Sequence, residues 1–355
     1  MKRIHVATEN KYDVLVGKGL LSNLGALVQE VFHAGKLCII SDERVNLLYG
    51  DAAERALSDA GFTIYRFAFS PGEESKSIAT YGRCLEFLAE NKFTRTDGIL
   101  ALGGGITGDL AGFVAATYLR GVQFIQVPTT FLAAIDSSVG GKTGVNLSLG
   151  KNLAGAFWQP ALVICDTDTF KTLAPDIFLD GVAEAIKYGI ILDRDLFTRI
   201  SENAPLTPTT SFLTDVITDC IALKARLVVE DERDTGIRQL LNLGHTIGHA
   251  IETCSDYAIS HGHAVATGID IITRAAVNYG YTTEQNSLLI HQVLSDHGFS
   301  ATTSFPAEAL LQVILNDKKR GGEDIHLIIP SEIGASTIRT FPVNALEGFI
   351  KAGLR

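Results

Sequence analysis

The sequence contains few cysteines, and their spacing excludes two common kinds of site. The five are scattered, odd in number and form no CxxC pair, so neither a disulfide framework nor a thiolate zinc site is indicated. We therefore expect buried, reduced thiols at Cys38, Cys84, Cys165, Cys220 and Cys254.

Positive charge is also scarce. The 355 residues include 30 Lys and Arg against 40 Asp and Glu, which gives a formal net charge of −10, and no long basic run is present. A nucleic-acid partner is disfavoured, because neutralising phosphates requires a basic surface. Any anionic ligand must therefore meet positive charge at a local site.

Long apolar segments are missing as well. No run approaches the roughly 20 apolar residues that span a bilayer, and the opening MKRIHVATENKYDVLV has no apolar stretch of signal-peptide length. We expect a soluble, cytoplasmic protein without a membrane partner.

The sequence does contain enough apolar residues for more than one core. Hydrophobic residues make up 46% of a chain that is long for a single core, which favours two domains. In the first half, short β-rich runs alternate with amphipathic segments, as is typical of an α/β fold with a mostly parallel sheet. The runs are KLCIISDE (36–43), FTIYRFAF (62–69), GILALGGG (98–105), VQFIQVPTT (122–130) and ALVICDT (161–167).

The second half has a different pattern. Helical periodicity dominates, and only DIHLIIP (324–330) and STIRTF (336–341) look extended. We place the boundary near Pro175, between an α/β domain (1–174) and a mainly α-helical domain (175–355). The predicted helical stretches are 182–202, 212–232, 239–253, 263–279 and 284–297.

A glycine-rich segment follows the third predicted strand. Gly103, Gly105 and Gly108 fit G-x-G-x-x-G before a helix, where bare backbone amides can approach a pyrophosphate, although a tight turn explains them equally well. Asp42 at a strand end and Glu73 in the turn PGEESK are placed to accept hydrogen bonds from ribose hydroxyls. Solvent exposure explains either carboxylate alone.

Residues 128–152, PTTFLAAIDSSVGGKTGVNLSLGKN, are predicted to form a long loop. A loop of this length without secondary structure is usually functional or disordered. Its glycines, hydroxyls and lysines suit phosphate binding. The polar side chains are Thr129, Thr130, Asp136, Lys142, Lys151 and Asn152.

Histidines of the second half suggest a metal site. LNLGHTIGHA (241–250) puts His245 and His249 four residues apart, on one face of a helix, and HGHAVA adds His261. With Glu184 of GVAEAIKYG, two imidazoles and one carboxylate match a catalytic zinc set with an open position. Structural histidines and a surface ion pair between Glu184 and Lys187 would explain the same residues.

These segments together resemble one family, the 3-dehydroquinate synthases. GGGITGDLAGFVAATYLRG, QVPTTFLAAIDSSVGGKTGVN, GVAEAIKYG, DERDTGIRQLLNLGHTIGHAIE and HGHAVA are similar to its motifs, in order, across most of residues 98–268. The resemblance implies a homodimer with a Rossmann-like NAD-binding N-terminal domain. It also implies a helical C-terminal domain that binds Zn²⁺, with Co²⁺ as a possible substitute.

The resemblance further implies the residues of each site. Glu184, His245 and His261 match metal ligands, and His249 matches a residue that faces substrate. Positions that match substrate contacts are Asp136, Lys142, Asn152, Lys187, Lys224, Arg238, Asn242, one of Lys318 or Lys319, and Arg120 reaching the partner subunit's site. Positions that match cofactor contacts are Asp42, Glu73, Lys76, Gly104, Gly105, Asp109, Thr129, Thr130, Lys142, Lys151, Thr169, Phe170 and Thr172.

The implied reaction converts 3-deoxy-D-arabino-heptulosonate 7-phosphate to 3-dehydroquinate and phosphate, within the shikimate pathway of aromatic amino acid biosynthesis. It combines transient oxidation at C5 by NAD, β-elimination of phosphate, re-reduction, ring opening and an intramolecular aldol closure. The chain departs from the family at His263 and Asp234, where Glu is usual. We expect His263 to lie beside the metal without ligating it.

Three alternatives remain open. A sibling sugar-phosphate cyclase that makes a deoxy-inosose or a valiolone would share the fold and both cofactors, but Asn242, His249 and the SSVGGK segment favour the dehydroquinate branch. A polyol dehydrogenase would not need so many anion-binding lysines. A non-enzymatic NAD-responsive protein would not need every metal and lysine position.

Overall fold

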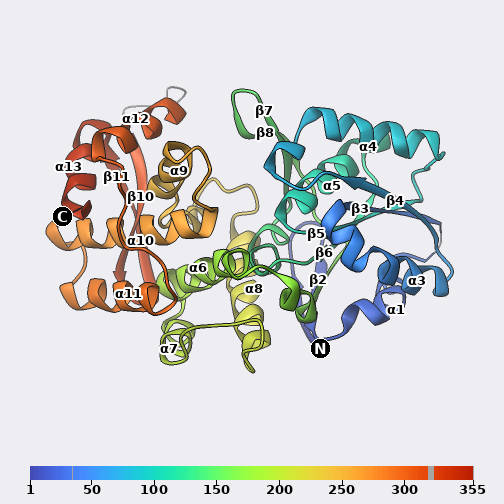
Figure 1. The fold of residues 1–355 in the computed structure, drawn as a ribbon, viewed down its shortest axis with the longest axis horizontal. Coiled ribbons are helices and arrows are strands. Elements are labelled where there is room, and N and C mark those ends of the chain that lie inside the picture. Colours follow the sequence, from blue (N-terminus) through green and yellow to red (C-terminus); the bar gives the residue numbers. More distant parts are fainter. Residues whose placement is uncertain (34, 319–323, 355) are drawn as a thin grey trace. The chain divides into compact units, whose positions relative to one another are not determined.

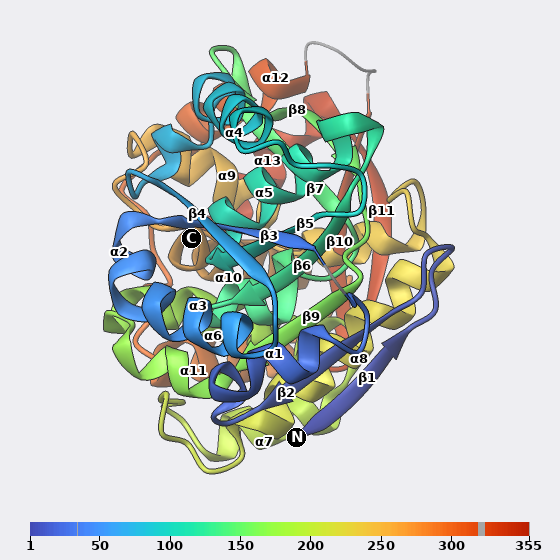
Figure 2. The same ribbon diagram turned by 90° about the vertical axis from the view of Figure 1, so that its right-hand side faces the viewer.

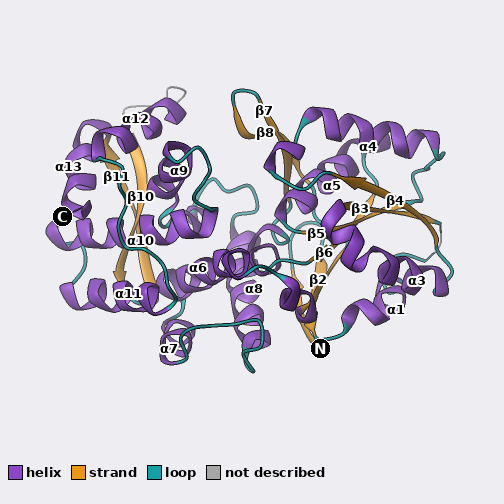
Figure 3. Ribbon diagram, in the orientation of Figure 1, coloured by secondary structure: helices purple, strands orange, loops and turns teal. Residues whose placement is uncertain are grey.

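The computed structural model describes residues 1–33, 35–318 and 324–354 (Figure 1). The chain forms two compact units, and the residues of each unit contact mainly one another. The first comprises Met1–Leu173 and Lys224–Arg233, and the second comprises Ala174–Leu223 and Asp234–Arg355. Most strands belong to the first unit, whereas helices dominate the second (Figure 3).

The first unit is built on a seven-stranded sheet with the order β1-β2-β9-β6-β5-β3-β4. β1 pairs antiparallel with β2, and every other neighbouring pair in this sheet is parallel. The predicted fold class is therefore confirmed, and all five predicted strands are present. The strands are β1 (Lys2–Val6), β2 (Tyr12–Gly17), β3 (Lys36–Asp42), β4 (Thr63–Phe69), β5 (Gly98–Gly103), β6 (Gln123–Pro128) and β9 (Leu162–Asp166).

Helices cover both faces of this sheet (Figure 2). In β3, Leu37 and Ile39 point to the core shared with α1 and α3, and Cys38 and Ile40 point to the core shared with α4 and α5. Both sets are buried because successive side chains alternate between the faces of a strand. The helices are α1 (Leu24–Val28), α2 (Glu43–Val45), α3 (Asp51–Asp59), α4 (Ile78–Glu90) and α5 (Gly105–Thr117).

The strand order reverses direction at β3 and β5. These strands are neighbours, but the chain runs from β3 to β4 on one side and from β5 to β6 on the other. In open α/β sheets, ligands bind outside the carboxyl ends of the strands at such a switch point. The loops after Asp42 and Gly103 leave the sheet at this position.

The prediction of a structureless loop over 128–152 is wrong. The segment contains a short helical turn, η5 (Ala133–Ser137), and a hairpin of β7 (Lys142–Leu147) and β8 (Gly150–Phe157). Gly144 pairs with Gly155, and a Cβ on Gly155 would lie 2.1 Å from the Thr143 carbonyl oxygen. Glycine weakens a strand pattern in a sequence, yet here it allows two backbones to approach closely.

The second unit is mainly helical, as predicted, with one hairpin of β10 (Asp324–Glu332) and β11 (Ala335–Pro342). Two of its helices, α12 and α13, had no counterpart among the predicted segments. Its helices are α6 (Pro175–Leu192), α7 (Arg194–Glu202), α9 (His245–Cys254), α10 (His261–Asn278), α11 (Glu284–Asp296), α12 (Ala307–Lys318) and α13 (Val343–Leu354), and α8 (Leu213–Glu230) contributes residues to both units.

The cysteines are free thiols, as expected, and four of the five are buried. Burial raises the pKa of Cys84 to about 12, so this thiol stays protonated and unreactive near neutral pH. Within the described residues, no helix combines the length and apolarity needed to cross a membrane.

Candidate active site

Three side chains of the second unit form a compact cluster. Glu184 lies in the middle of α6, whereas His245 and His261 are the first residues of α9 and α10. The Glu184 Oε1 atom lies 3.5 Å from the Nε2 atom of each histidine. Ligand atoms bound tetrahedrally at about 2.0–2.1 Å from a zinc ion would be about 3.3 Å apart. The spacing therefore fits a divalent cation held by one carboxylate and two imidazoles.

Further contacts fix which nitrogen each histidine presents. The Nδ1 atom of His245 lies 3.1 Å from the Leu243 carbonyl oxygen, and that of His261 lies 3.3 Å from Glu252 Oε2. A carbonyl or carboxylate on one ring nitrogen sets the tautomer and leaves the other nitrogen for a metal. Both rings thus direct Nε2 at Glu184, as a metal site requires.

Glycines bring the helices of the cluster together. Gly244, with φ of 81°, is the N-cap residue of α9 and follows Leu243, the C-cap residue of the 3-10 helix η7 (Ile237–Asn242). A Cβ on Gly268 of α10 would lie 2.2 Å from the Gly244 carbonyl oxygen, and one on Gly248 would lie 3.1 Å from Ala264. Backbone-to-backbone packing therefore sets the positions of His245 and His261.

His249 lies beside the cluster, with its ring centroid 5.4 Å from that of His245 and 5.8 Å from that of His261. Its side chain is exposed, in contrast to the buried Glu184. His249, Glu252 and His261 also lie within metal-binding distance of one another. Glu252 already contacts Nδ1 of His261, the nitrogen that does not face Glu184. The second group therefore arises because Glu252 orients a member of the first cluster.

The charges in the cluster differ between its members. Burial, reinforced by the nearby Lys187 ammonium, holds the pKa of His245 well below its usual range, so this ring is neutral. Burial also opposes the charged form of His261, but the neighbouring carboxylates of Glu184 and Glu252 outweigh it and raise the pKa to about 10. Two carboxylates around His261 are suited to a site that holds positive charge.

Lys187 forms an ion pair with Glu184 on α6. The exposed fractions of the two side chains are 1% and 0%, so the alternative of an ordinary surface ion pair is wrong. Burying a lysine and a carboxylate is expensive, which makes this pair a candidate for function.

Other predicted substrate residues of the second unit lie on η7, just before α9. Arg238 is buried and Asn242 is exposed. Lys318 ends α12, and its side chain lies outside the described residues, as does all of Lys319.

The structure describes the surroundings of His263 and Asp234, the two residues that depart from the family pattern. His263 Nδ1 lies 2.8 Å from Ser260 Oγ and 3.2 Å from Asp180 Oδ1, and its ring packs edge-on against Phe299. His263 is absent from the metal-ligand cluster. Asp234 lies between α8 and η7 with φ of 57°.

In the first unit, several of the predicted cofactor residues follow the carboxyl ends of the parallel strands. Gly103 ends β5, and Gly104 and Gly105 begin α5. A Cβ on Gly104 would lie 3.2 Å from Thr130, and one on Gly105 would lie 3.1 Å from Ser137. The turn therefore keeps its backbone bare at the N-terminus of a helix, as phosphate binding requires.

Side chains from the neighbouring strand ends surround this turn. Asp42 caps α2 by accepting from Val45 N, 3.0 Å away. Thr129 follows β6, and its N–H donates to the Gly103 carbonyl over 2.9 Å. After β9, the Thr172 hydroxyl lies 2.6 Å from the Tyr49 hydroxyl, while Thr169 and Phe170 are buried. The predicted residues thus occupy several strand ends of one sheet.

A polar cluster lies where the turn before α4 meets the β7–β8 hairpin. Lys76, only 5% exposed, donates to Asp109 and to Asn152, each over 2.5 Å. Asn146 donates to Glu73 over 2.7 Å. Burial raises the pKa of Asp109, and Lys76 opposes the rise.

The remaining predicted residues of the first unit are not all brought together. Lys224 of α8 forms an ion pair with Asp136 and also donates to its carbonyl oxygen over 2.6 Å. Lys142 and Lys151 are exposed on the β7–β8 hairpin. Arg120 is exposed, with φ of 70°, after α5.

Glu252 contacts His261, and Asp180 contacts the residues on either side of His261, but neither carboxylate was predicted from the sequence. Glu252 lies seven residues after His245 and three after His249, so its helical spacing could have indicated a shared face. Asp180 lies one turn before Glu184, but its contacts with residues 260–263 required the structure.

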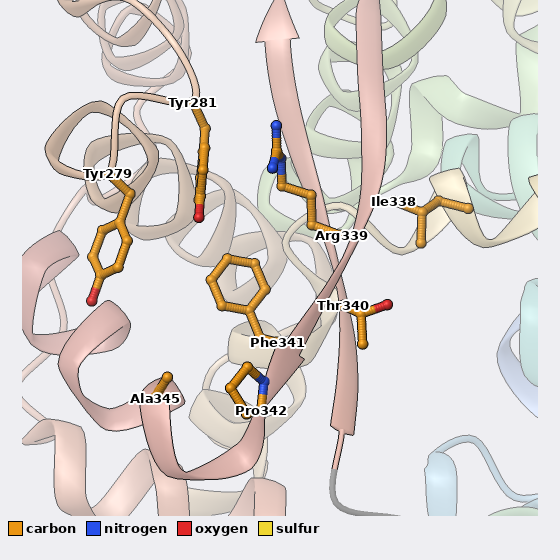
Figure 4. A pocket seen from close by; sticks show the side chains of 8 residues that line it. All are labelled: Tyr279, Tyr281, Ile338, Arg339, Thr340, Phe341, Pro342 and Ala345. Carbon is orange, nitrogen blue, oxygen red and sulfur yellow. The ribbon is translucent and has the colours of Figure 1, made fainter.

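A surface pocket with a volume of about 450 Å³ lies elsewhere in the second unit, and Figure 4 shows the residues that line it. Tyr279, Tyr281 and Phe341 line it, and Arg339 lies over the Tyr281 ring, 4.1 Å from the centroid. No residue predicted for metal, cofactor or substrate is among the lining residues, so the pocket is separate from the candidate site.

Solved structures similar to this chain establish the fold. A 2-deoxy-scyllo-inosose synthase complexed with carbaglucose-6-phosphate, NAD⁺ and Co²⁺ is 26% identical, with a TM-score of 0.88 over 99% of this chain and 100% of that one. A 2-epi-5-epi-valiolone synthase from Streptomyces hygroscopicus with NAD⁺ and Zn²⁺ bound is 23% identical, with a TM-score of 0.89 over 99% and 98%. A glycerol dehydrogenase from Schizosaccharomyces pombe is 15% identical, with a TM-score of 0.69 over 99% and 90%.

Sequence comparison is more specific. Family models for the N-terminal and C-terminal parts of 3-dehydroquinate synthase match residues 66–180 and 181–320. A 3-dehydroquinate synthase from Enterococcus faecalis is 41% identical over 99% of this chain and 98% of its own length, and one from Streptococcus mutans is 40% identical over 96% and 97%. The chain therefore belongs to the 3-dehydroquinate synthase family of enzymes.

Proposed function

We propose that the chain converts 3-deoxy-D-arabino-heptulosonate 7-phosphate to 3-dehydroquinate and phosphate, using NAD and a divalent cation, Zn²⁺. The cluster of Glu184, His245 and His261 is the observation that carries this proposal, because it offers metal-ligand spacing and oriented imidazoles. The relatives at about 40% identity support the choice of substrate.

Glu184, His245 and His261 would hold the cation through one carboxylate oxygen and two Nε2 atoms. Co²⁺ could replace Zn²⁺, since both accept such ligands. When bound, the cation would supply Lewis acidity at the hydroxyl to be oxidised, and NAD would supply reversible hydride transfer. Glu252 and the Leu243 carbonyl would keep the two rings in the tautomer that ligation needs.

NAD would bind in the first unit, at the switch point of its sheet. Gly104 and Gly105 would present backbone N–H groups of α5 to the pyrophosphate. Asp42, Glu73 and the other acceptors at the strand ends would contact ribose hydroxyls. The predicted cofactor contacts also include Lys76, Asp109, Thr129, Thr130, Lys142, Lys151, Thr169, Phe170 and Thr172.

The substrate carries a carboxylate and a phosphate, so it requires cationic partners on an acidic protein. We assign anion contacts to Lys142, Asn152, Lys224, Arg238 and Asn242, together with one of Lys318 or Lys319. Asp136, Lys187 and His249 would contact hydroxyl groups. Lys187 and Lys224 are each held by a carboxylate, which positions their ammonium groups before the substrate arrives.

We also propose that the enzyme is a homodimer in which Arg120 reaches the partner subunit's site. The β7–β8 hairpin exposes four large apolar side chains, with Leu149 82% exposed. Exposed apolar clusters commonly mark protein interfaces. Those side chains are Leu147, Leu149, Leu153 and Phe157.

Light scattering on the eluting protein tests the oligomer. We expect the mass of two chains for the parent and of one chain for Leu149→Glu, since a charge would be buried at the interface. Leu289→Glu, at another exposed leucine on α11, is the control and should leave the mass unchanged. A parent protein that elutes as a monomer at all concentrations contradicts the homodimer.

A sibling sugar-phosphate cyclase is the second candidate, supported by the 26% identical inosose synthase. Incubation with the heptulosonate phosphate, following phosphate and dehydroquinate together, separates the two candidates. The proposal expects both products in equal amounts. Turnover of glucose 6-phosphate with no dehydroquinate from the heptulosonate would favour the sibling.

A further inference from the structure

The start of α10 is attached to α6 in an unusual way. Ser260 is the N-cap residue of α10, yet its side chain makes no capping hydrogen bond to the helix. Asp180 of α6 caps the helix instead, because its Oδ1 atom accepts a hydrogen bond from the Gly262 N–H over 2.9 Å. A residue on one helix thus caps the N-terminus of another, where a carboxylate is favourable.

The same carboxylate oxygen also contacts the polar side chains of Ser260 and His263 in this turn. The Ser260 hydroxyl donates to Asp180 Oδ1 over 2.6 Å, and His263 Nδ1 lies 3.2 Å away. Asp180 is largely buried, with 13% of its side chain exposed. The side chain therefore has little freedom to change its partners.

Backbone packing adds a second, independent constraint at this point. A Cβ on Gly262 would lie 2.3 Å from the Asp180 Cα and 2.5 Å from its carbonyl oxygen. The backbones of α6 and α10 therefore meet directly. Only glycine allows the contact, and the hydrogen bonds from Asp180 hold the two backbones in register.

This attachment lies between two residues of the candidate metal cluster. Asp180 is one helical turn before Glu184 on α6, and Gly262 follows His261 directly. A shift of the first turn of α10 relative to α6 would change the separation of Glu184 Oε1 and His261 Nε2, which is 3.5 Å.

We propose that Asp180 is a positioning residue for the metal: it caps α10 from α6 and so fixes His261 relative to Glu184. The inference rests on the proposed function, because it takes a divalent cation to bind at Glu184, His245 and His261. Asp180 touches neither cation nor substrate, and acts through the backbone of residues 260–262.

The test measures metal affinity of the full-length protein, stripped of metal and titrated with Zn²⁺ against a chromophoric chelator. Asp180→Ala should raise the Kd about 10- to 100-fold, the usual effect of removing a group that orients a ligand. Asp180→Asn should raise it less, because its amide oxygen can still accept from Gly262. Asp176→Asn, at an exposed position one turn earlier on α6, is the matched control and should stay within about twofold of the parent.

A second measurement separates positioning from general stability. The visible spectrum of bound Co²⁺ reports ligand geometry, so Asp180→Ala should shift it, whereas a purely structural residue would lower only the melting temperature. If Asp180→Ala does not fold, Asp180→Asn and Ser260→Ala replace it, and both should weaken metal binding. Folded variants with the parental Kd and spectrum overturn the proposal.

His245→Ala separates the inference from the function beneath it. If the parent binds metal, His245→Ala does not, and Asp180→Ala binds like the parent, the inference alone fails. If the parent and His245→Ala bind metal alike, or neither binds it, the cluster is not the metal site. The inference then fails together with that part of the proposed function.

Discussion

His245 and His249 lie one helical turn apart on α9, but their surroundings differ. His245 is held by the Leu243 carbonyl with Nε2 towards Glu184, whereas His249 is exposed beside the cluster. Two histidines at this spacing therefore need not bind the same ion, and their contacts distinguish a ligand from a neighbour.

We predict that His245→Ala and His261→Ala lose the bound metal, whereas His249→Ala keeps it and loses most turnover. Removing one of the three proposed ligands leaves too few donors for tight binding, while His249 is not part of the group of Glu184, His245 and His261. Elemental analysis of the three purified variants, with circular dichroism as the folding control, checks this. A folded His249→Ala protein without metal would contradict the assignment.

Asp97 provides a prediction for pH at the residue scale. Burial disfavours its charge, but the backbone N–H groups of Lys36 and Thr94 and the Thr94 hydroxyl donate to it and lower its pKa. A lowered folded pKa stabilises the fold above the unfolded value of about 3.9, and this contribution is lost as pH falls through the folded pKa.

Asp97→Asn should therefore lower the free energy of unfolding by about 1–2 kcal/mol at pH 7, since the hydrogen bonds from Lys36 and Thr94 lose their charged acceptor. Urea unfolding at pH 7 and at pH 3 measures the difference between parent and variant. We expect the difference to shrink at pH 3, and a constant difference would show that the charge of Asp97 contributes nothing.

Part of the candidate site could be predicted residue by residue. Glu184, His245 and His261 were selected by residue type and by resemblance, and the structure brings them together. Glu252 was not selected, although its helical spacing places it near the face of His245 and His249. Asp180 was not selected because a carboxylate that accepts from a backbone N–H of another helix has no spacing rule. Asp180 is 82 residues from Gly262, so only the folded chain reveals their contact.

At the scale of elements, glycines control how α9 and α10 cross. A Cβ on Gly268 would lie 2.2 Å from the Gly244 carbonyl oxygen, and backbone cannot rotate away as a side chain can. Gly82 on α4 has nothing within 4 Å of the corresponding position. The two glycines therefore offer a matched comparison of the same substitution.

Gly268→Ala should lower the free energy of unfolding by about 1–3 kcal/mol and weaken metal binding, since it forces α9 and α10 apart. Gly82→Ala should raise the free energy of unfolding by about 0.4–1 kcal/mol, because alanine restricts the unfolded chain and the helix has space for its Cβ at this position. Urea unfolding and chelator competition on the metal-free proteins test both. Parental stability and affinity in Gly268→Ala would show that the helices tolerate a wider crossing.

The elements most accurately predicted were those with a continuous apolar pattern. β3 and β5 are buried on both faces, so each is a run of apolar residues with clear ends. The β7–β8 hairpin was missed because Gly144 and Gly155 form a pair across it and exposed leucines interrupt any alternation. The break at Gly244 was missed too, since 239–253 has one helical pattern although η7 and α9 are separate.

At the scale of the whole molecule, the first compact unit is not one continuous stretch of the chain. Lys224–Arg233 belongs with the first unit, although it lies far along the chain among helices of the second. The ion pair between Lys224 and Asp136 and the hydrogen bond from Gln159 to Glu232 attach this stretch to other residues of the first unit. A change in helical pattern cannot reveal such a return of the chain.

The hydride balance distinguishes the proposed reaction from that of a dehydrogenase of similar fold. If NAD is the oxidant in one half of the cycle and NADH the reductant in the other, phosphate is released with no net reduced cofactor. A polyol dehydrogenase would instead release NADH in step with the substrate consumed. The two activities therefore differ in how many turnovers one NAD supports.

We predict many phosphates per NAD and a flat NADH absorbance when catalytic NAD and excess heptulosonate phosphate are supplied to the metal-loaded enzyme. Recording phosphate and absorbance in the same cuvette makes the comparison direct, and the His245→Ala protein serves as the control for contaminating phosphatase. NADH that accumulates in step with substrate consumed would favour the dehydrogenase. If NAD and metal are bound but phosphate appears neither from the heptulosonate phosphate nor from glucose 6-phosphate, a binding protein is favoured, because every step after oxidation depends on the loss of that group.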